Sequence, residues 1–148
     1  MDPITAITTA GTAVKVVSQV STVLFTFIQD TKRVDNNLSS FFVEIQVLKT
    51  ALTSIADSFQ DTSLRKSTNV QVDHWNSIDD ALHECNKTCE ELLGVLDGIR
   101  GDHKESTTLN RVVRQIKLDW ESGTIGVLRS RIQCHTTSLQ LALQIINV

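Results

Sequence analysis

Apolar residues recur every three or four positions along most of this 148-residue chain, which is the period of an amphipathic helix rather than of a strand. The chain has one proline and six glycines, so it offers few turn signals between strands. The pattern predicts an all-α protein, a helical bundle of four to five helices at about 3–29, 38–59, 74–99, 106–121 and 123–147.

The first predicted helix is unusually poor in charge, since Lys15 is the one charged residue between Pro3 and Gln29. Asp2 is a suitable N-cap, and Pro3 suits the first helical position. The apolar arc is wider than an ordinary amphipathic stripe. We expect its inward face to contain Ile7, Ala10, Val14, Val17, Val20 or Ser21, Leu24 and Ile28, flanked by Val16, Val23 and Phe27.

The other predicted helices are conventional amphipathic segments separated by polar stretches. A long loop is expected over 60–72, and the third helix should end near Gly98 and Gly101. A break at Ser122–Gly123 separates the last two helices, although one long kinked helix is the alternative. The expected inward residues include Phe41, Ile45, Leu48, Leu52 and Ile55, then Ile78, Leu82, Cys85, Cys89, Leu92 and Leu96, and finally Leu128, Ile132, Leu139 and Leu143.

The chain length predicts a single domain over 1–148. Because the chain ends at Ile146-Asn147-Val148 without a helix stop signal, we expect it to be the N-terminal part of a longer protein. The formal charge of −3 and the pI of about 5.7 argue against nucleic-acid binding. Three cysteines are an odd number and do not form a spaced disulfide framework, so a reducing compartment is expected. A signal peptide usually begins with positively charged residues, whereas this chain has the acidic Asp2 there, so we expect no signal peptide.

The sequence contains none of the usual motifs for phosphate, dinucleotide, zinc or acyl chemistry, so we expect neither an enzyme nor a cofactor. The best metal candidate combines His83, Cys85 and Cys89 with Cys134 and His135. Because Cys85 and Cys89 fall on the leucine face of their helix, we interpret them as small core residues and expect no metal site.

Basic residues form a row on the fourth predicted helix and continue into the fifth. They are either an ordinary solvated face or contacts for anionic lipid headgroups, worth up to about 1 kcal/mol each near a charged membrane. The residues are Arg111, Arg114, Lys117, Arg129 and Arg131.

The first helix is long enough to cross a bilayer, but its many threonines and Lys15 make a permanent span unfavourable. Insertion as an oligomer is more favourable, because hydroxyls can bond between helices and small residues such as Ala6, Ala10, Gly11 and Ala13 permit close approach. Lys15 would then face a water-filled interior. A buried central helix that never meets a membrane explains the same composition.

Four segments resemble the N-terminal domains of fungal HeLo-like and NLR-type (STAND) proteins. They are Met1-Asp2-Pro3-Ile4 with the charge-poor helix, and Glu44-Ile45-x-x-Leu48-x-x-x-Leu52. Ala81-Leu82-x-x-Cys85-x-x-Thr88-x-x-Glu91-Leu92 and the stretch from Leu128-Arg129-x-Arg131-Ile132 to Leu141-Ala142-Leu143 complete the set. The resemblance covers the whole chain in order, although each piece alone is a common helical pattern.

The resemblance implies a cell-death effector of fungal incompatibility or innate immunity, cytoplasmic at rest and at the plasma membrane when activated. Its implied partners are further copies of itself, anionic membrane lipids and an upstream NLR or amyloid signalling protein. In the resting state the first helix would pack on the second, third and fifth predicted helices. The membrane-active residues would be Ile4, Ile7, Ala10, Gly11, Val14, Lys15, Val17, Val20, Leu24, Phe25, Phe27 and Ile28.

The alternative is a protein-interaction module that oligomerises an NLR-type receptor without touching lipid. The membrane hypothesis predicts leakage of anionic liposomes and loss of killing after Val17→Asp or removal of residues 1–28. The interaction hypothesis predicts self-association and indifference to liposomes.

Overall fold

The computed structural model describes residues 3–30, 36–60, 72–102 and 123–146, and all four segments are helical. They form α1 (Pro3–Asp30), α2 (Asn36–Gln60), α4 (Val72–Asp102) and α6 (Thr124–Ile146). The described residues contain no strand. The all-α prediction is therefore confirmed, and the helix predicted at 106–121 lies outside the described residues.

The predicted helix bounds agree with the observed ones to within about three residues. The third predicted helix was expected to end near Gly98 and Gly101, and α4 ends at Asp102, three residues beyond the predicted bound of 99. Among the described residues no glycine has a positive φ angle, so Gly98 does not form the left-handed cap that ends many helices. Gly123 lies in a bend just before α6 begins, which agrees with the predicted break.

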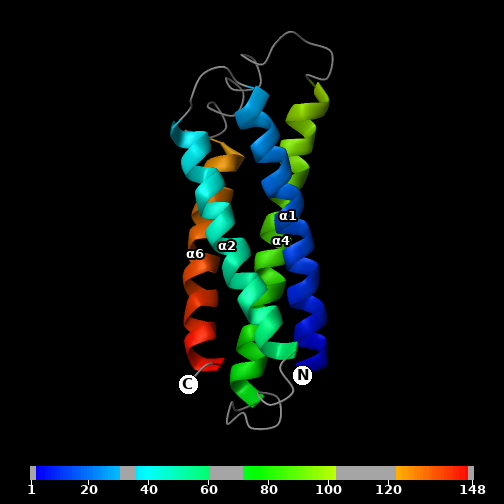
Figure 1. Cartoon of the computed structure of the whole chain (residues 1–148), viewed down its shortest axis with the longest axis vertical. Coiled ribbons are helices and arrows are strands. Elements are labelled where there is room, and N and C mark those ends of the chain that lie inside the picture. Colours follow the sequence, from blue (N-terminus) through cyan, green and yellow to red (C-terminus); the bar gives the residue numbers. More distant parts are fainter. Residues whose placement is uncertain (1–2, 31–35, 61–71, 103–122, 147–148) are drawn as a thin grey trace.

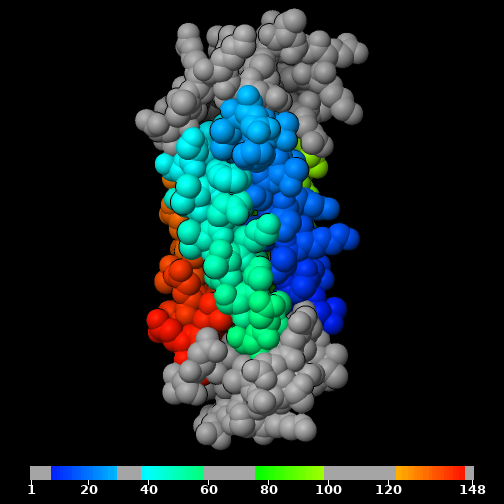
Figure 2. All heavy atoms as spheres, viewed as in Figure 1, coloured from blue at the N-terminus to red at the C-terminus, as the bar shows by residue number. Residues whose placement is uncertain are grey.

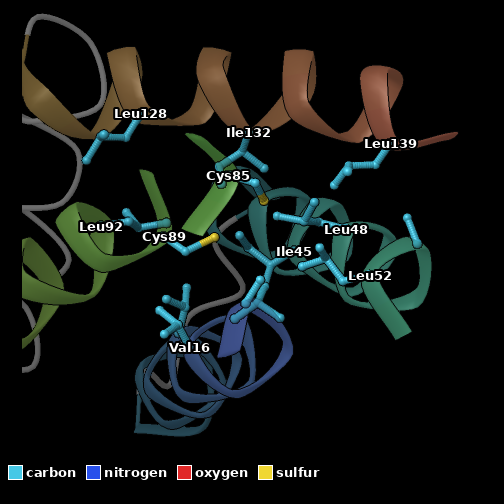
Figure 3. Packing of buried hydrophobic residues seen from close by; sticks show 14 of the residues in the cluster. Val16, Ile45, Leu48, Leu52, Cys85, Cys89, Leu92, Leu128, Ile132 and Leu139 are labelled. Atoms are coloured by element: carbon cyan, nitrogen blue, oxygen red, sulfur yellow. The ribbon is translucent and has the colours of Figure 1, made fainter. Parts of the chain in front are cut away.

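The four helices lie side by side along one long axis and alternate in direction along the chain (Figure 1). α1 packs directly on α2 and α4, and α6 packs directly on the same two helices. α1 and α6 therefore occupy opposite corners of the bundle, as the close-up in Figure 3 also shows. We expected the first helix to pack directly on the last predicted helix as well, and that expectation is wrong.

Apolar side chains from all four helices form one continuous core. Figure 3 shows Val16 of α1 pointing toward Cys89 of α4. Ile45 of α2 and Ile132 of α6 also point into this core. Each helix contributes side chains spaced three or four residues apart, so the amphipathic pattern of the sequence accounts for the burial. The largest fully buried side chains are Phe41, Leu24, Ile45, Leu48, Leu52, Ile55, Leu82, Leu92, Leu96, Ile125 and Leu128.

Candidate functional site

α1 is the candidate functional element, and its buried arc is wide because it packs against two neighbouring helices. Val14 and Ile28, expected at the centre of the inward face, are only partly buried, whereas Ala13 is completely buried. Gly11, Lys15 and Phe25 face outward. The side chains of Ile4 and Ile7 lie outside the described set. The core residues of α1 are Ala10, Ala13, Val16, Val17, Val20, Val23, Leu24 and Phe27.

The outward half of α1 is polar but nearly uncharged, and Figure 2 shows this helix at the molecular surface beside α2. Its exposed residues include Thr12, Lys15, Gln19 and Thr22. Phe25 is 47% exposed and its ring contacts that of Phe42 in α2, with the centroids 5.9 Å apart. α1 thus combines an apolar inner face with a hydroxyl-rich outer face.

Hydroxyl groups along α1 donate hydrogen bonds to carbonyl oxygens of the preceding turn. The four bonds run from Thr12 to Thr8, from Ser18 to Val14, from Thr22 to Ser18 and from Thr26 to Thr22, at 2.7–3.0 Å. A hydroxyl whose proton is already bonded within its helix is less costly to remove from water. The threonines therefore oppose membrane insertion less than their number in the sequence suggests.

Two side-chain hydrogen bonds with neutral donors join α1 to α2 and α4. Gln46 of α2 donates to the Ser21 hydroxyl, and the Thr9 hydroxyl donates to Asp79 Oδ1 of α4 at 3.5 Å. Within the described segments, ion pairs between helices join α2 with α6 and α4 with α6, and Lys15 takes part in none of them. α1 is held in place chiefly by apolar packing.

A charged cluster on the opposite side fixes α6 to α2. Arg129 donates from Nε to Glu44 Oε2 at 2.6 Å and from Nη2 to Oε1 at 2.9 Å, and Gln133 donates to Oε1 at 2.8 Å. Burial alone would raise the pKa of Glu44, but the hydrogen bonds from Arg129 and Gln133 and the charge of Arg129 hold it below its usual range. This bidentate pair is a strong, geometrically specific contact.

The predicted headgroup contacts are partly engaged within the fold. Arg129 binds Glu44, and Arg131 lies 3.5 Å from Glu91 of α4, with half of its own side chain exposed. Arg111, Arg114 and Lys117 lie outside the described residues. Lipid contact by this row stays a prediction, for which exposed Arg131 is better placed than Arg129.

The metal candidate does not assemble in the described part of the chain, where no three potential ligands lie together. Cys85 and Cys89 are buried in the core, as the leucine-face interpretation predicts, and Cys134 is exposed on α6. A hydrogen bond with the Cys85 thiol, together with burial, raises the pKa of Cys89. His83 pairs with Asp79 on its own helix, and His135 faces Thr88.

His135 forms a polar contact between α4 and α6. Its Nε2 lies 2.8 Å from the Thr88 hydroxyl, which itself donates to the Glu84 carbonyl at 3.0 Å, so we assign Nε2–H as the donor to Thr88. Burial lowers the pKa of His135; nearby Glu84 opposes this and Arg131 adds to it. The neutral imidazole is therefore the form that the fold favours.

Acid is expected to destabilise the domain in two steps. Because the pKa of His135 is lower in the folded chain, the unfolded chain takes up the proton first below about pH 6.5, and the free energy of unfolding falls until the folded pKa is passed. The stabilisation from Glu44 is present above its unfolded pKa and is lost at lower pH, as pH falls through the folded pKa. Urea unfolding at several pH values measures both steps.

His135→Gln should flatten the first step, which for one group is at most about 1.4 kcal/mol per pH unit. Glu44→Gln should leave that step intact and change only the second. An unaltered slope near pH 6 in His135→Gln would contradict the assignment.

Among the described helices, Thr8–Gln29 is long and apolar enough to cross a membrane. Core helices of soluble proteins meet the same criterion, and α1 is a core helix in this fold.

Comparisons with protein families, curated proteins and solved structures gave no match.

Proposed function

We propose that this domain is a membrane-permeabilising effector of the HeLo-like, cell-death type, which acts when clustered copies release α1 into a lipid bilayer. The observation that carries the proposal is the way α1 is held. It contributes a wide apolar face to the core, yet the ion pairs between the described helices join the other three. Release of α1 would leave the Glu44–Arg129 and Glu91–Arg131 pairs in place.

Burial energies indicate why such a domain would rest in the closed state. Six apolar side chains of α1 larger than alanine are buried, each worth about 1.5–3 kcal/mol. Exposing them to water would cost on the order of 10 kcal/mol, so spontaneous opening is rare. A bilayer or an oligomer that buries the same face removes most of that cost, which makes release conditional on clustering at a membrane.

The two faces of α1 suit an oligomeric pore. The inner face would meet lipid, and the outer face with Lys15, Gln19 and the threonines would line a water-filled interior. The domain would thus reside in the cytoplasm at rest and at the plasma membrane once activated, with anionic lipids and copies of itself as partners. An upstream NLR or amyloid signalling protein would supply the clustering.

The test is dye release from anionic vesicles by the whole chain, clustered through a C-terminal hexahistidine tag on nickel-chelating lipids. α1 begins at the bundle end where α6 finishes, so this tag directs the start of α1 toward the bilayer (Figure 1). We expect release that rises more steeply than linearly with bound protein. Folded, clustered protein that leaves the vesicles intact would overturn the proposal.

The second candidate function is a protein-interaction and oligomerisation module that never contacts lipid. The exposed apolar residues Val127, Leu141 and Ile145 on α6 favour it. Among the described helices, α2 and α4 pack against the opposite face of α6 and leave these residues uncovered. Self-association without dye release would select this function.

A further inference from the structure

The outward face of α6 has no partner in the described part of the bundle. α6 contacts α2 on one side and α4 on the other, while α1 lies diagonally across the core. Three large apolar side chains nevertheless point outward from α6. They are Val127 at 54%, Leu141 at 55% and Ile145 at 43% exposure.

Two of these residues, Val127 and Leu141, belong to a stripe that follows a seven-residue repeat. Val127, Cys134 and Leu141 are each seven positions apart, so successive members shift by only about 20° around a straight helix. Exposed Ser130 and Ser138 lie between them. Exposed Ile145 lies one turn beyond Leu141. We call the five residues Val127, Ser130, Cys134, Ser138 and Leu141 the α6 stripe. It carries no charge, and the adjacent Arg131 is paired with Glu91 of its own bundle.

The α6 stripe is balanced about its middle residue. Cys134 lies midway between Val127 and Leu141, and also midway between Ser130 and Ser138. We infer that two copies of the chain pack through antiparallel α6 stripes, related by a twofold axis at Cys134. Val127 of each copy then meets Leu141 of the other, and Ser130 meets Ser138.

A second copy is the occupant that this pattern fits. A twofold interface must be complementary to itself, and a stripe that reads large, small, small, small, large from either end meets that condition. The absence of charge means that two copies approach without like-charge repulsion, and antiparallel helices place opposite dipole ends together. Small residues at the centre allow the helices to come close. This inference does not rest on the membrane proposal, because it concerns the chain in solution.

Cys134 is a native reporter for this arrangement, because Cys85 and Cys89 are buried in the core. Light scattering of the reduced chain should show a concentration-dependent rise toward twice its 16.4 kDa mass. Mild oxidation should give a disulfide-linked dimer, whereas Cys134→Ser should keep the reversible dimer and lose the covalent one. A chain that stays monomeric over the whole concentration range would overturn the inference.

Matched substitutions locate the surface. Leu141→Asp should abolish the dimer, while Val47→Asp, at an exposed position of α2, should leave it intact. Circular dichroism should confirm that both variants fold. Orientation follows from Cys134→Ser chains carrying Val127→Cys or Leu141→Cys. Cross-linking of the mixture between the two kinds of chain supports the antiparallel pair. Linking of each kind only with itself, or loss of the dimer in Val47→Asp alone, would overturn it.

Discussion

A disulfide that ties α1 to α4 is expected to reduce vesicle leakage at least tenfold, and reduction of that disulfide should restore it. The positions are Thr9 and Asp79, whose short side chains end 3.5 Å apart. In Thr9→Cys/Asp79→Cys, made in a Cys134→Ser background, oxidation would covalently prevent α1 from leaving the core. Cys85 and Cys89 are buried and should not take part. Dye release from clustered protein is measured before and after adding a reductant.

Comparing the oxidised with the reduced form of this double variant tests the release of α1 by itself, because both forms have the same sequence. The single variant Thr9→Cys carries half of the change and cannot form the bond, so its leakage should not respond to oxidation. Full leakage by the oxidised double variant, with the disulfide verified by mass spectrometry, would contradict the release of α1. Loss of leakage in the single variant would instead assign the effect to Thr9 itself.

Val17→Asp is expected to unfold the domain rather than to disable it at the membrane. Val17 is completely buried, and an unpaired carboxylate in an apolar core costs several kcal/mol against a total stability of about 5–15 kcal/mol. We expect a loss of about 4 kcal/mol or more, seen in urea denaturation as a collapsed or non-cooperative transition. Its predicted loss of killing would therefore say nothing about lipid.

Gln19→Asp is the matched control, two residues further along the same helix. Gln19 is exposed and lies one turn after Lys15, so the new carboxylate is solvated and its stability effect should stay within about 0.5 kcal/mol. In the proposed pore this position faces water, and leakage should persist. A strongly destabilised Gln19→Asp would contradict the observed orientation of α1.

Removal of residues 1–28 has the same weakness as Val17→Asp, because it takes one side of the core away.

The helices could be predicted from the sequence because their determinants are local. Apolar spacing located α1, α2, α4 and α6, and the leucine-face argument placed Cys85 and Cys89 in the core. The arrangement of the helices could not be predicted in this way, since periodicity indicates that a face is buried but not which helix covers it. The direct packing of the first helix on the last was wrong for this reason.

The charged contacts were missed because they join distant parts of the chain. Glu44 and Arg129 are separated by 85 positions, and the sequence offered Arg129 only as a possible lipid contact. A signal was present, since Glu44 is a lone charge among Phe41, Phe42 and Ile45. A charge in such a setting often indicates a partner from another helix.

The diagonal placement of α1 and α6 sets the geometry of any larger assembly. Two bundles joined along α6 would carry their α1 helices on the outermost sides of the pair, facing away from each other. Such a particle is bivalent, and one vesicle held by the first α1 leaves the second available to another vesicle. Tethering of vesicles into clusters, visible as turbidity before any dye escapes, is the collective behaviour that this geometry would produce.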